Sequence, residues 1–343
     1  MTSLALKNKQ MLLPKHLVVV SMLLLILFLS SIVLSVAFGS RAVSFTGIID
    51  GLFHPDVTSH EATVVRQRIA RTIFSLMCGA ALGVSGALMQ SVTRNPIADP
   101  SILGVNTGAS LFVVCGIAFF NSSAASDYIW LAIIGAIITA IFVFSIGSLG
   151  ASGATPLKLV LAGAATSAIL SSLVTAIMIP RTNVIDEFRF WQVGSVGAGN
   201  WTSVQLLLPF LLIGILLAIC TAPALNALAL GDEVATGLGV RTGMLRMIAA
   251  FAGVLLCGAV TALAGPIGFI GLLATHLIRL VIGADIRFIV PLAALAGASI
   301  LTISDVCGRF LGSPGELEVG ILTAFIGAPI LILITMKAKM RAL

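Results

Sequence analysis

Charged side chains are scarce in this sequence of 343 residues, because only 9% of them are Asp, Glu, Lys or Arg. A soluble domain carries roughly a quarter charged residues. Hydrophobic residues make up 59%, and the mean hydropathy is +1.15. This balance excludes a soluble enzyme, a disordered chain and a nucleic-acid binder, despite a formal charge of +6. At about 20 residues per membrane crossing, the sequence predicts an all-α polytopic membrane protein.

Motifs for nucleotides, metals and nucleophilic catalysis are also missing from the sequence. The dipeptide Gly-Lys does not occur, so the chain cannot build a phosphate-binding P-loop. Neither a His-Glu-x-x-His motif nor a nucleophile elbow is present. The five cysteines form no Cys-x-x-Cys pair, and we interpret them as small packing residues. The sequence therefore predicts no catalytic residue, no metal and no directly bound cofactor.

Ten apolar stretches follow one another along the chain. The first comes after Lys7, Lys9 and Lys15, and it is longer than the core of a signal peptide, so we expect it to be retained. Several later stretches are short or interrupted by Gly or Pro, which membrane proteins tolerate where the backbone is covered by protein. Small residues at Gly79-xxx-Gly83 and Gly104-xxx-Gly108 predict closely packed helices. The stretches are 17–38, 72–90, 101–120, 128–148, 157–179, 203–222, 244–264, 267–282, 288–307 and 318–336.

An even number of spans places both termini on the same side of the membrane. With both termini in the cytoplasm, twelve of the nineteen Lys and Arg residues lie on the inner side, as the positive-inside rule requires. The predicted organisation is a cytoplasmic tail at 1–16, a single transmembrane domain at 17–336 and a second cytoplasmic tail at 337–343.

Seven arginines lie on the outer side against this rule, and four of them, Arg66, Arg68, Arg71 and Arg309, fall at the outer ends of spans. Two interpretations stay open at this point. The arginines could pair locally with the carboxylates of Glu61, Glu316 or Glu318. They could instead form a docking surface for acidic groups arriving from outside, because a guanidinium group binds carboxylates well.

The longest inner loop, about 223–243, is a candidate surface for a cytoplasmic partner. Its sequence predicts helix over Ala224–Leu230 and again over Asp232–Leu238, with Asp232 as the N-cap of the second piece. A passive connector is the alternative interpretation of this loop.

Ionisable residues within the spans are few, and they define a second class of function. Asp305 is the main acidic residue, and His276 lies one helical turn before Arg279. Such residues are functional candidates in a membrane helix. A secondary transporter driven by protons would use them, although it usually needs more buried carboxylates. A multi-span scaffold without transport is a third possibility.

Several motifs follow one another along the chain. Arg68-Ile-Ala-Arg71 runs on into CGAALGVSGALMQSVTRNPIADPSILGVNTGAS, from Cys78 to Ser110. The other motifs are Leu161-Ala-Gly-Ala, Trp191-Gln-Val-Gly-Ser195, Leu230 to Gly239, Gly265 to Leu272, Ser304 to Arg309 and Val319 to Pro329. Together the motifs cover residues 66 to 336. In this order they resemble the FecCD-type permease family, the membrane subunits of bacterial ABC importers for ferric siderophores, haem and cobalamin.

The resemblance implies a protomer of ten helices with the type II ABC-importer architecture in the bacterial cytoplasmic (inner) membrane. It implies a second permease protomer, identical or homologous, and two ATPase subunits that hold ATP and Mg²⁺. An extracytoplasmic binding protein would deliver the substrate, with transport by alternating access. A ferric siderophore is favoured as substrate, and haem and cobalamin stay open as alternatives.

The resemblance also implies roles for individual residues. The arginines that receive acidic residues of the binding protein match Arg68, Arg71 and Arg309. The ATPase-coupling positions match Asn226, Leu230, Gly231, Asp232, Glu233, Ala235, Gly237, Leu238 and Gly239. We expect an apolar, hydroxyl-rich pathway at Ser85, Met89, Asn106 and Thr107. The chain departs from the family where Ala70, Thr275 and Glu318 replace prolines, which puts the local backbone near Arg71 and before the last span in doubt.

Overall fold

The computed structural model describes residues 13–341 except 55, 97, 121–124 and 150–155, and every regular element among them is a helix. The predicted N-terminal tail lies outside the described residues as far as residue 12. The elements are α2 Leu13–Ala37, α3 Phe45–Phe53, α4 His60–Thr93, η1 Pro100–Leu103, α5 Val105–Phe120, α6 Ala125–Gly147, α7 Pro156–Met178, α8 Thr182–Val193, α9 Trp201–Ala229, α10 Asp232–Gly237, α11 Thr242–Ala264, α12 Ile270–Ile282, α13 Ile286–Leu311 and α14 Val319–Arg341.

Seven of the described helices are long and apolar enough to cross a membrane. Three shorter apolar helices, Val105–Phe120, Ile270–Ile282 and Val319–Ile332, fall within the remaining predicted stretches. The largest change in boundary concerns the second stretch, expected at 72–90, because α4 begins at His60. Ser59 caps this helix by accepting a hydrogen bond from the amide of Ala62, which allows the helix to begin in a charged segment.

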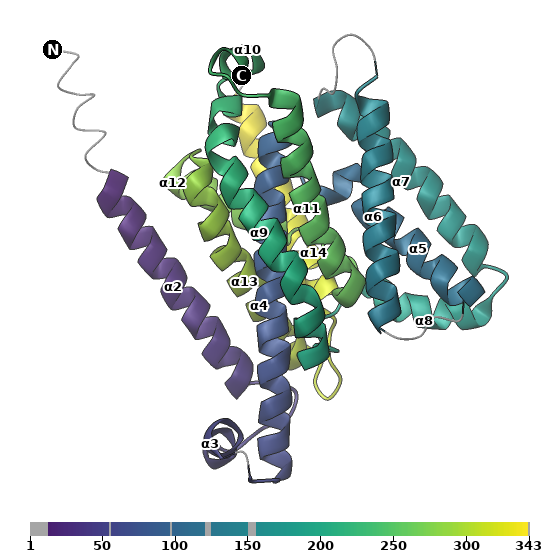
Figure 1. The fold of residues 1–343 in the computed structure, drawn as a ribbon. Coiled ribbons are helices and arrows are strands. Elements are labelled where there is room, and N and C mark those ends of the chain that lie inside the picture. The colour runs from purple at the N-terminus through teal and green to yellow at the C-terminus, as the bar shows by residue number, and fades with distance from the viewer. Residues whose placement is uncertain (1–12, 55, 97, 121–124, 150–155, 342–343) are drawn as a thin grey trace.

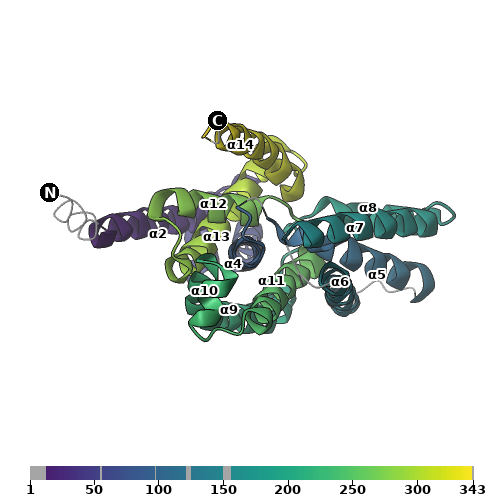
Figure 2. The same cartoon turned by 90° about the horizontal axis from the view of Figure 1, so that it is seen from above.

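Most of the helices lie side by side, and α4 runs through the middle of the larger group of helices (Figure 1). The short helices α3 and α8 lie at one end of the molecule, here called the α3 end. Helix α10 lies at the opposite end, the α10 end, where α2 begins and α14 ends. Seen from above, α14 stands on one face of the molecule, and α9 and α11 lie on the other (Figure 2).

Close packing between α4 and its neighbours depends on glycine. A Cβ atom at Gly79 would overlap the carbonyl oxygen of Gly297 in α13, and one at Gly83 would overlap that of Ala293. Gly86 meets Gly271 of α12 in the same way. The spacing of small residues along α4 thus places three backbone contacts on one helix, as predicted for the Gly79-xxx-Gly83 pair.

The chain breaks its helical course between α11 and α12, at residues 265–269. Phe269 has a φ of 69°, which is rare for a residue other than glycine. The segment after α8 covers this break, because the amide of Ser195 donates to the carbonyl of Ala264 at 2.7 Å. The amide of Gly320 in turn donates to Gly194 at 2.9 Å. Irregular backbone is therefore covered by protein, as a nonpolar surrounding requires.

Candidate functional site

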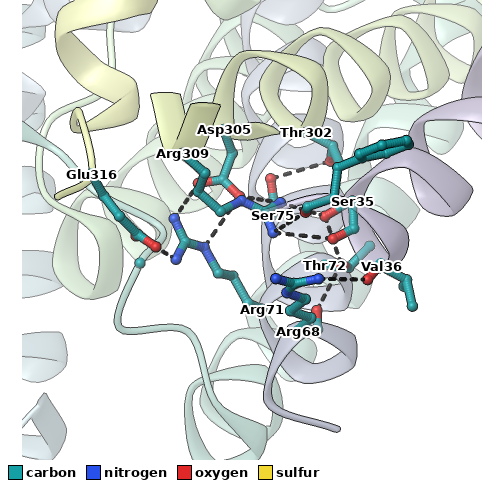
Figure 3. A network of polar contacts seen from close by, with 12 residues as sticks. Ser35, Val36, Arg68, Arg71, Thr72, Ser75, Thr302, Asp305, Arg309 and Glu316 are labelled. Atoms are coloured by element: carbon teal, nitrogen blue, oxygen red, sulfur yellow. Dashed lines mark hydrogen bonds and ion pairs between the residues drawn. The ribbon is translucent and has the colours of Figure 1, made fainter. Parts of the chain in front are cut away.

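The three arginines singled out in the sequence meet where α2, α4 and α13 come together near the α3 end (Figure 3). Arg68 and Arg71 are three residues apart on α4, and Arg309 belongs to the last turn of α13. Arg68 is 7% exposed and Arg309 is 2% exposed. The sequence therefore identified residues that the fold gathers, but their guanidinium groups point into the protein.

Asp305 joins two of the arginines. Its Oδ1 accepts a hydrogen bond from Nη2 of Arg71 at 2.6 Å, and its Oδ2 accepts one from Nε of Arg71 at 3.2 Å. Nη2 of Arg309 lies 2.9 Å from the same Oδ2. The Asp305 side chain is only 3% exposed, so its charge needs these cationic partners.

The end of α2 is held by Arg68 and Arg309. Arg309 donates to the carbonyl oxygens of Ser35 and Phe38 at 3.0 and 3.2 Å. Arg68 donates to the carbonyl oxygens of Ala37 and Arg41 at 3.1 and 2.6 Å. The last carbonyls of a helix lack partners within the helix and favour a positive charge. Arg68 and Arg309 thus fix the first long helix to the bundle.

Glu316 lies at the accessible edge of this cluster, in the loop between α13 and α14. Its carboxylate is 2.7 Å from Nη1 of Arg71, and it accepts a hydrogen bond from the Ser40 hydroxyl at 3.2 Å. Partial burial opposes its ionisation, but the hydrogen bond from Arg71 and the charge of that arginine outweigh burial. The pKa of Glu316 therefore lies below its ordinary value.

The cluster contains three guanidinium groups and two carboxylates, which leaves one positive charge in excess. Local pairing, one of the two interpretations of the sequence, is observed for Arg71 with Glu316. Glu61 instead accepts hydrogen bonds from the amide and hydroxyl of Ser44.

Sequence reasoning considered Asp305 only as a proton carrier and missed its pairing with arginine. The spacing of Asp305 and Arg309, four residues apart on one helix, is the signal that could have shown it.

A second candidate site is the predicted coupling loop at the α10 end. The expected helices at Ala224–Leu230 and Asp232–Leu238 correspond to the last turns of α9 and to α10. The N-cap prediction is wrong, because Gly231 holds that position and Asp232 is the first residue of α10. The Asp232 carboxylate binds Arg94 at 2.5 Å and Arg246 at 2.8 Å, which ties α10 to α4 and α11.

Three large apolar side chains are exposed on this element. Leu230, Val234 and Leu238 are 67%, 48% and 64% exposed. Val234 and Leu238 are one helical turn apart, and Leu230 lies at the end of α9 just before α10. These three residues are here called the apolar row. Ala235 is fully buried beneath them. Glu233, Gly237 and Gly239 are exposed, and Gly231 is partly buried. This apolar row is open to a partner.

Asn226, also predicted at the coupling site, faces the bundle. Its amide nitrogen donates to Oδ1 of Asp285 at 2.6 Å, and its amide oxygen accepts from the N–H of Ile286 at 2.8 Å. The side chain of Arg287 donates two hydrogen bonds to Asp285. Hydrogen bonding with Arg287 lowers the pKa of Asp285 to about 2. Asn226 therefore fastens the coupling element to the start of α13.

The four residues predicted for the pathway occupy different surroundings. Ser85 and Met89 are buried where α4 packs on α11, and the Ser85 hydroxyl donates to the carbonyl of Gly253. The amide oxygen of Asn106 accepts a hydrogen bond from Thr261 at 3.0 Å. Thr107 lies on a cavity of about 300 Å³ formed by α5, α7 and α8. Ser110, Ser171, Thr175 and Gln192 add polar groups to this cavity.

The two residues considered for proton transfer lie in different parts of the structure. Asp305 belongs to the arginine cluster, near the end of α13. His276 lies in the middle of α12, whose Arg279 donates to Gln90 and Ser91 of α4. The structure does not bring Asp305 and His276 together in one described network.

Comparisons with known proteins give a consistent result. The model of the FecCD transport family matches residues 23–337. The ferric enterobactin transport system permease protein FepD of Escherichia coli (strain K12) is 39% identical over 92% of this chain and 94% of its own. The Fe(3+)-citrate import system permease protein YfmD of Bacillus subtilis (strain 168) is 38% identical over 92% and 93%. A solved structure of an inward-facing, metal-chelate type ABC transporter has a TM-score of 0.80 at 27% identity and covers 95% of this chain and 99% of its own.

Proposed function

Because the chain belongs to the FecCD transport family, we propose that it is the permease subunit of an ATP-driven importer that carries a ferric chelate across the bacterial cytoplasmic membrane. The observation that carries this proposal is the similarity to FepD over more than nine tenths of both chains. Relatives named for ferric citrate and ferric hydroxamate support the same class of substrate. A ferric siderophore is the substrate we favour within it.

In this proposal the chain crosses the membrane ten times, with both termini in the cytoplasm. Support comes from seven long apolar helices and three shorter ones. The start of α2 and the end of α14 lie toward the same end of the molecule, which is consistent with an even number of crossings (Figure 1). Residues 17–336 would form the single transmembrane domain. A second permease protomer would complete the pathway, to which the polar cavity around Thr107 contributes.

The motor of the importer would be two separate ATPase subunits, since the chain has no P-loop sequence. ATP and Mg²⁺ would bind to those subunits. The apolar row of Leu230, Val234 and Leu238 is the surface we assign to them. An exposed row of this kind at the end of a membrane protein suits the seat of a soluble partner.

The extracytoplasmic binding protein would dock at the α3 end, over Arg71 and its partner Glu316. Arg71 is 14% exposed and Glu316 is 36% exposed, so this ion pair is the accessible part of the cluster. Arg68 and Arg309 lie beneath it and supply the excess of positive charge. Acidic groups of the binding protein would be attracted to that excess.

Uptake by purified components tests the proposal. The permease would be reconstituted in proteoliposomes with its ATPase subunits and the binding protein, and uptake of a ⁵⁵Fe-labelled chelate would be measured. We expect uptake that requires ATP and the binding protein. Uptake by the permease alone under a proton gradient would contradict it. A panel of ferric siderophores, ferric citrate, haem and cobalamin offered to the binding protein would identify the substrate.

A further inference from the structure

An apolar cavity of about 590 Å³ lies between α6 and α11, and Leu217 of α9 and Leu103 of η1 also line it. These helices are on the opposite side of the molecule from α14 (Figure 2). Ile137, Ile141 and Phe144 form the α6 wall, and Met247 and Phe251 form part of the α11 wall. Exposure of Ile141, Met247 and Phe251 exceeds 40%, so the cavity opens sideways.

The cavity has the shape of a wedge because of where the two helices touch. A Cβ atom on Gly258 of α11 would lie 3.1 Å from Cβ of Ala136 in α6, so the backbones are close at this level. Every lining residue of α6 follows Ala136, and every lining residue of α11 precedes Gly258. The helices run in opposite directions, so they diverge toward the α10 end (Figure 1).

The length of the wedge matches one leaflet of a bilayer. Its lining on α6 extends from Ile137 to Ser145, which is about 12 Å at 1.5 Å per residue. Half of a hydrocarbon core of about 30 Å is about 15 Å. The wedge is therefore deep enough for the acyl chain of a lipid in the leaflet at the α10 end.

Two basic residues lie at the α10 end, one at the start of α11 and one close to the end of α6. Arg241 is exposed at the N-cap of α11, and it lies on the same face as Ile248 of the wedge, about 10 Å or two turns away. Lys158 lies in the first turn of α7, and its ammonium group donates to the carbonyl of Leu149, just beyond α6, at 2.9 Å. Basic pockets between membrane helices at the headgroup level bind anionic lipids.

We propose that the wedge is a binding site for an anionic phospholipid of the leaflet at the α10 end. One acyl chain fills the apolar wedge, and the phosphate group lies near Arg241 and Lys158. The lining is apolar except for Ser145, so it suits a hydrocarbon chain and not a polar ligand. The inference requires only that the chain resides in a bilayer, and it stands apart from the identity of the transported substrate.

Quenching of tryptophan fluorescence by brominated acyl chains tests the site. The full chain would carry Phe144→Trp inside the wedge, or Phe142→Trp as a control on the same helix at a similar depth. Phe142 is 51% exposed and does not line the cavity. Each variant is reconstituted with brominated phosphatidylglycerol or brominated phosphatidylcholine at equal mole fraction. The signal of the three native tryptophans is subtracted with the unmodified chain.

We expect tryptophan at position 144 to prefer the anionic lipid, with a relative exchange constant about fivefold higher for each basic residue that contributes about 1 kcal/mol. Arg241→Ala with Lys158→Ala should remove the preference at position 144, and position 142 should show none. Equal quenching by both lipids at position 144 would overturn the proposal. So would quenching at position 142 alone, because protein would then fill the wedge. An equal effect of the double variant at both positions would indicate only general attraction of lipid to the surface, and it would also overturn the site.

Discussion

Arg71 donates two hydrogen bonds to the buried carboxylate of Asp305, a residue 234 positions later in the chain. This contact joins the central helix α4 to α13 close to the α3 end. It also places a buried carboxylate between two guanidinium groups. The role of Asp305 is therefore structural in the state described, and its removal should be costly.

Asp305→Asn should destabilise the fold by about 3–5 kcal/mol, because it leaves the guanidinium groups of Arg71 and Arg309 without their shared anion. Unfolding of the purified protein in mixed micelles, titrated with SDS, would measure the change. Glu316→Gln is the matched control, since that exposed pair should contribute less than about 1 kcal/mol. Equal stability of the Asp305 variant and the unmodified protein would contradict this account of the cluster.

The Arg71–Glu316 pair should regulate the affinity of the binding protein. Glu316→Gln releases Nη1 of Arg71, while Nε and Nη2 stay bound to Asp305. This change should tighten docking by about fivefold, as expected for loss of an exposed competitor worth about 1 kcal/mol. Arg71→Ala should weaken docking by about 30-fold or more if the acidic group of the binding protein that pairs with Arg71 is desolvated in the complex. Affinity would be measured with the permease complex in nanodiscs.

Arg66→Ala is the control for this prediction, because the described hydrogen bonds of Arg66 go only to the carbonyls of His54 and Val57. A loss as large in the control would show that the effect is not specific to this pair.

The apolar row of Leu230, Val234 and Leu238 should carry the contact with the ATPase. Leu238→Ala combined with Leu230→Ala should weaken assembly by about tenfold or more, since truncation of buried interface anchors costs more than about 1 kcal/mol each. Substrate-stimulated ATP hydrolysis by the purified complex would fall in parallel. Thr236→Ala, an exposed change in the same helix, should have little effect. Full stimulation in the double variant would remove α10 from the interface.

Bulk at the α4–α13 contact should disrupt the protomer. A side chain at Gly83 would meet the carbonyl of Ala293, so Gly83→Val should cost about 1–3 kcal/mol or more through overpacking. The yield of folded protein and its melting temperature would report the loss. Gly237→Ala provides the comparison, because a Cβ atom there has open space around it. We expect that change to be neutral or slightly stabilising.

Stability should depend on pH through Asp285. Its folded pKa of about 2 is below the ordinary value of about 3.9, so the charged form stabilises the fold above about pH 4. This contribution disappears as the pH falls through about 2. Asp285→Asn keeps the capping geometry but removes the charge. The stability difference between the two proteins should therefore be constant above about pH 5, decrease as the pH falls toward 2 and vanish near pH 1. A difference that does not change with pH would exclude the charge as its source.

Much of the fold could be predicted because membrane spans depend on local composition. All ten apolar stretches contain a helix, and the two helical pieces of the coupling loop lie where the sequence placed them. Boundaries were less predictable, since the start of α4 depends on the Ser59 cap within a charged segment. The contact between Arg71 and Asp305 could not be derived, because it depends on how α4 and α13 pack and not on spacing along the chain.

The candidate sites show the same division between local and long-range information. Arg68, Arg71 and Arg309 were identified as unusual from the side of the membrane on which they fall. The burial of Arg68 and Arg309 against the end of α2 could be found only from the tertiary structure. In the same way, the sequence indicated a hydroxyl-rich lining, but only Thr107 of the four expected residues lies on the polar cavity.

Helix α13 extends from Asp285, held by Asn226 at the α10 end, to Asp305 and Arg309 at the α3 end. The distance along the helix between the two aspartates is about 30 Å. Because contacts hold both ends of α13, a tilt of the helix that displaces one end also acts on the contacts at the other end. Any event that selects one tilt from outside therefore changes the free energy of events inside, and the reverse effect has the same magnitude. The coupling free energy between the two ends of α13 can therefore be measured from the effect of either end on binding at the other.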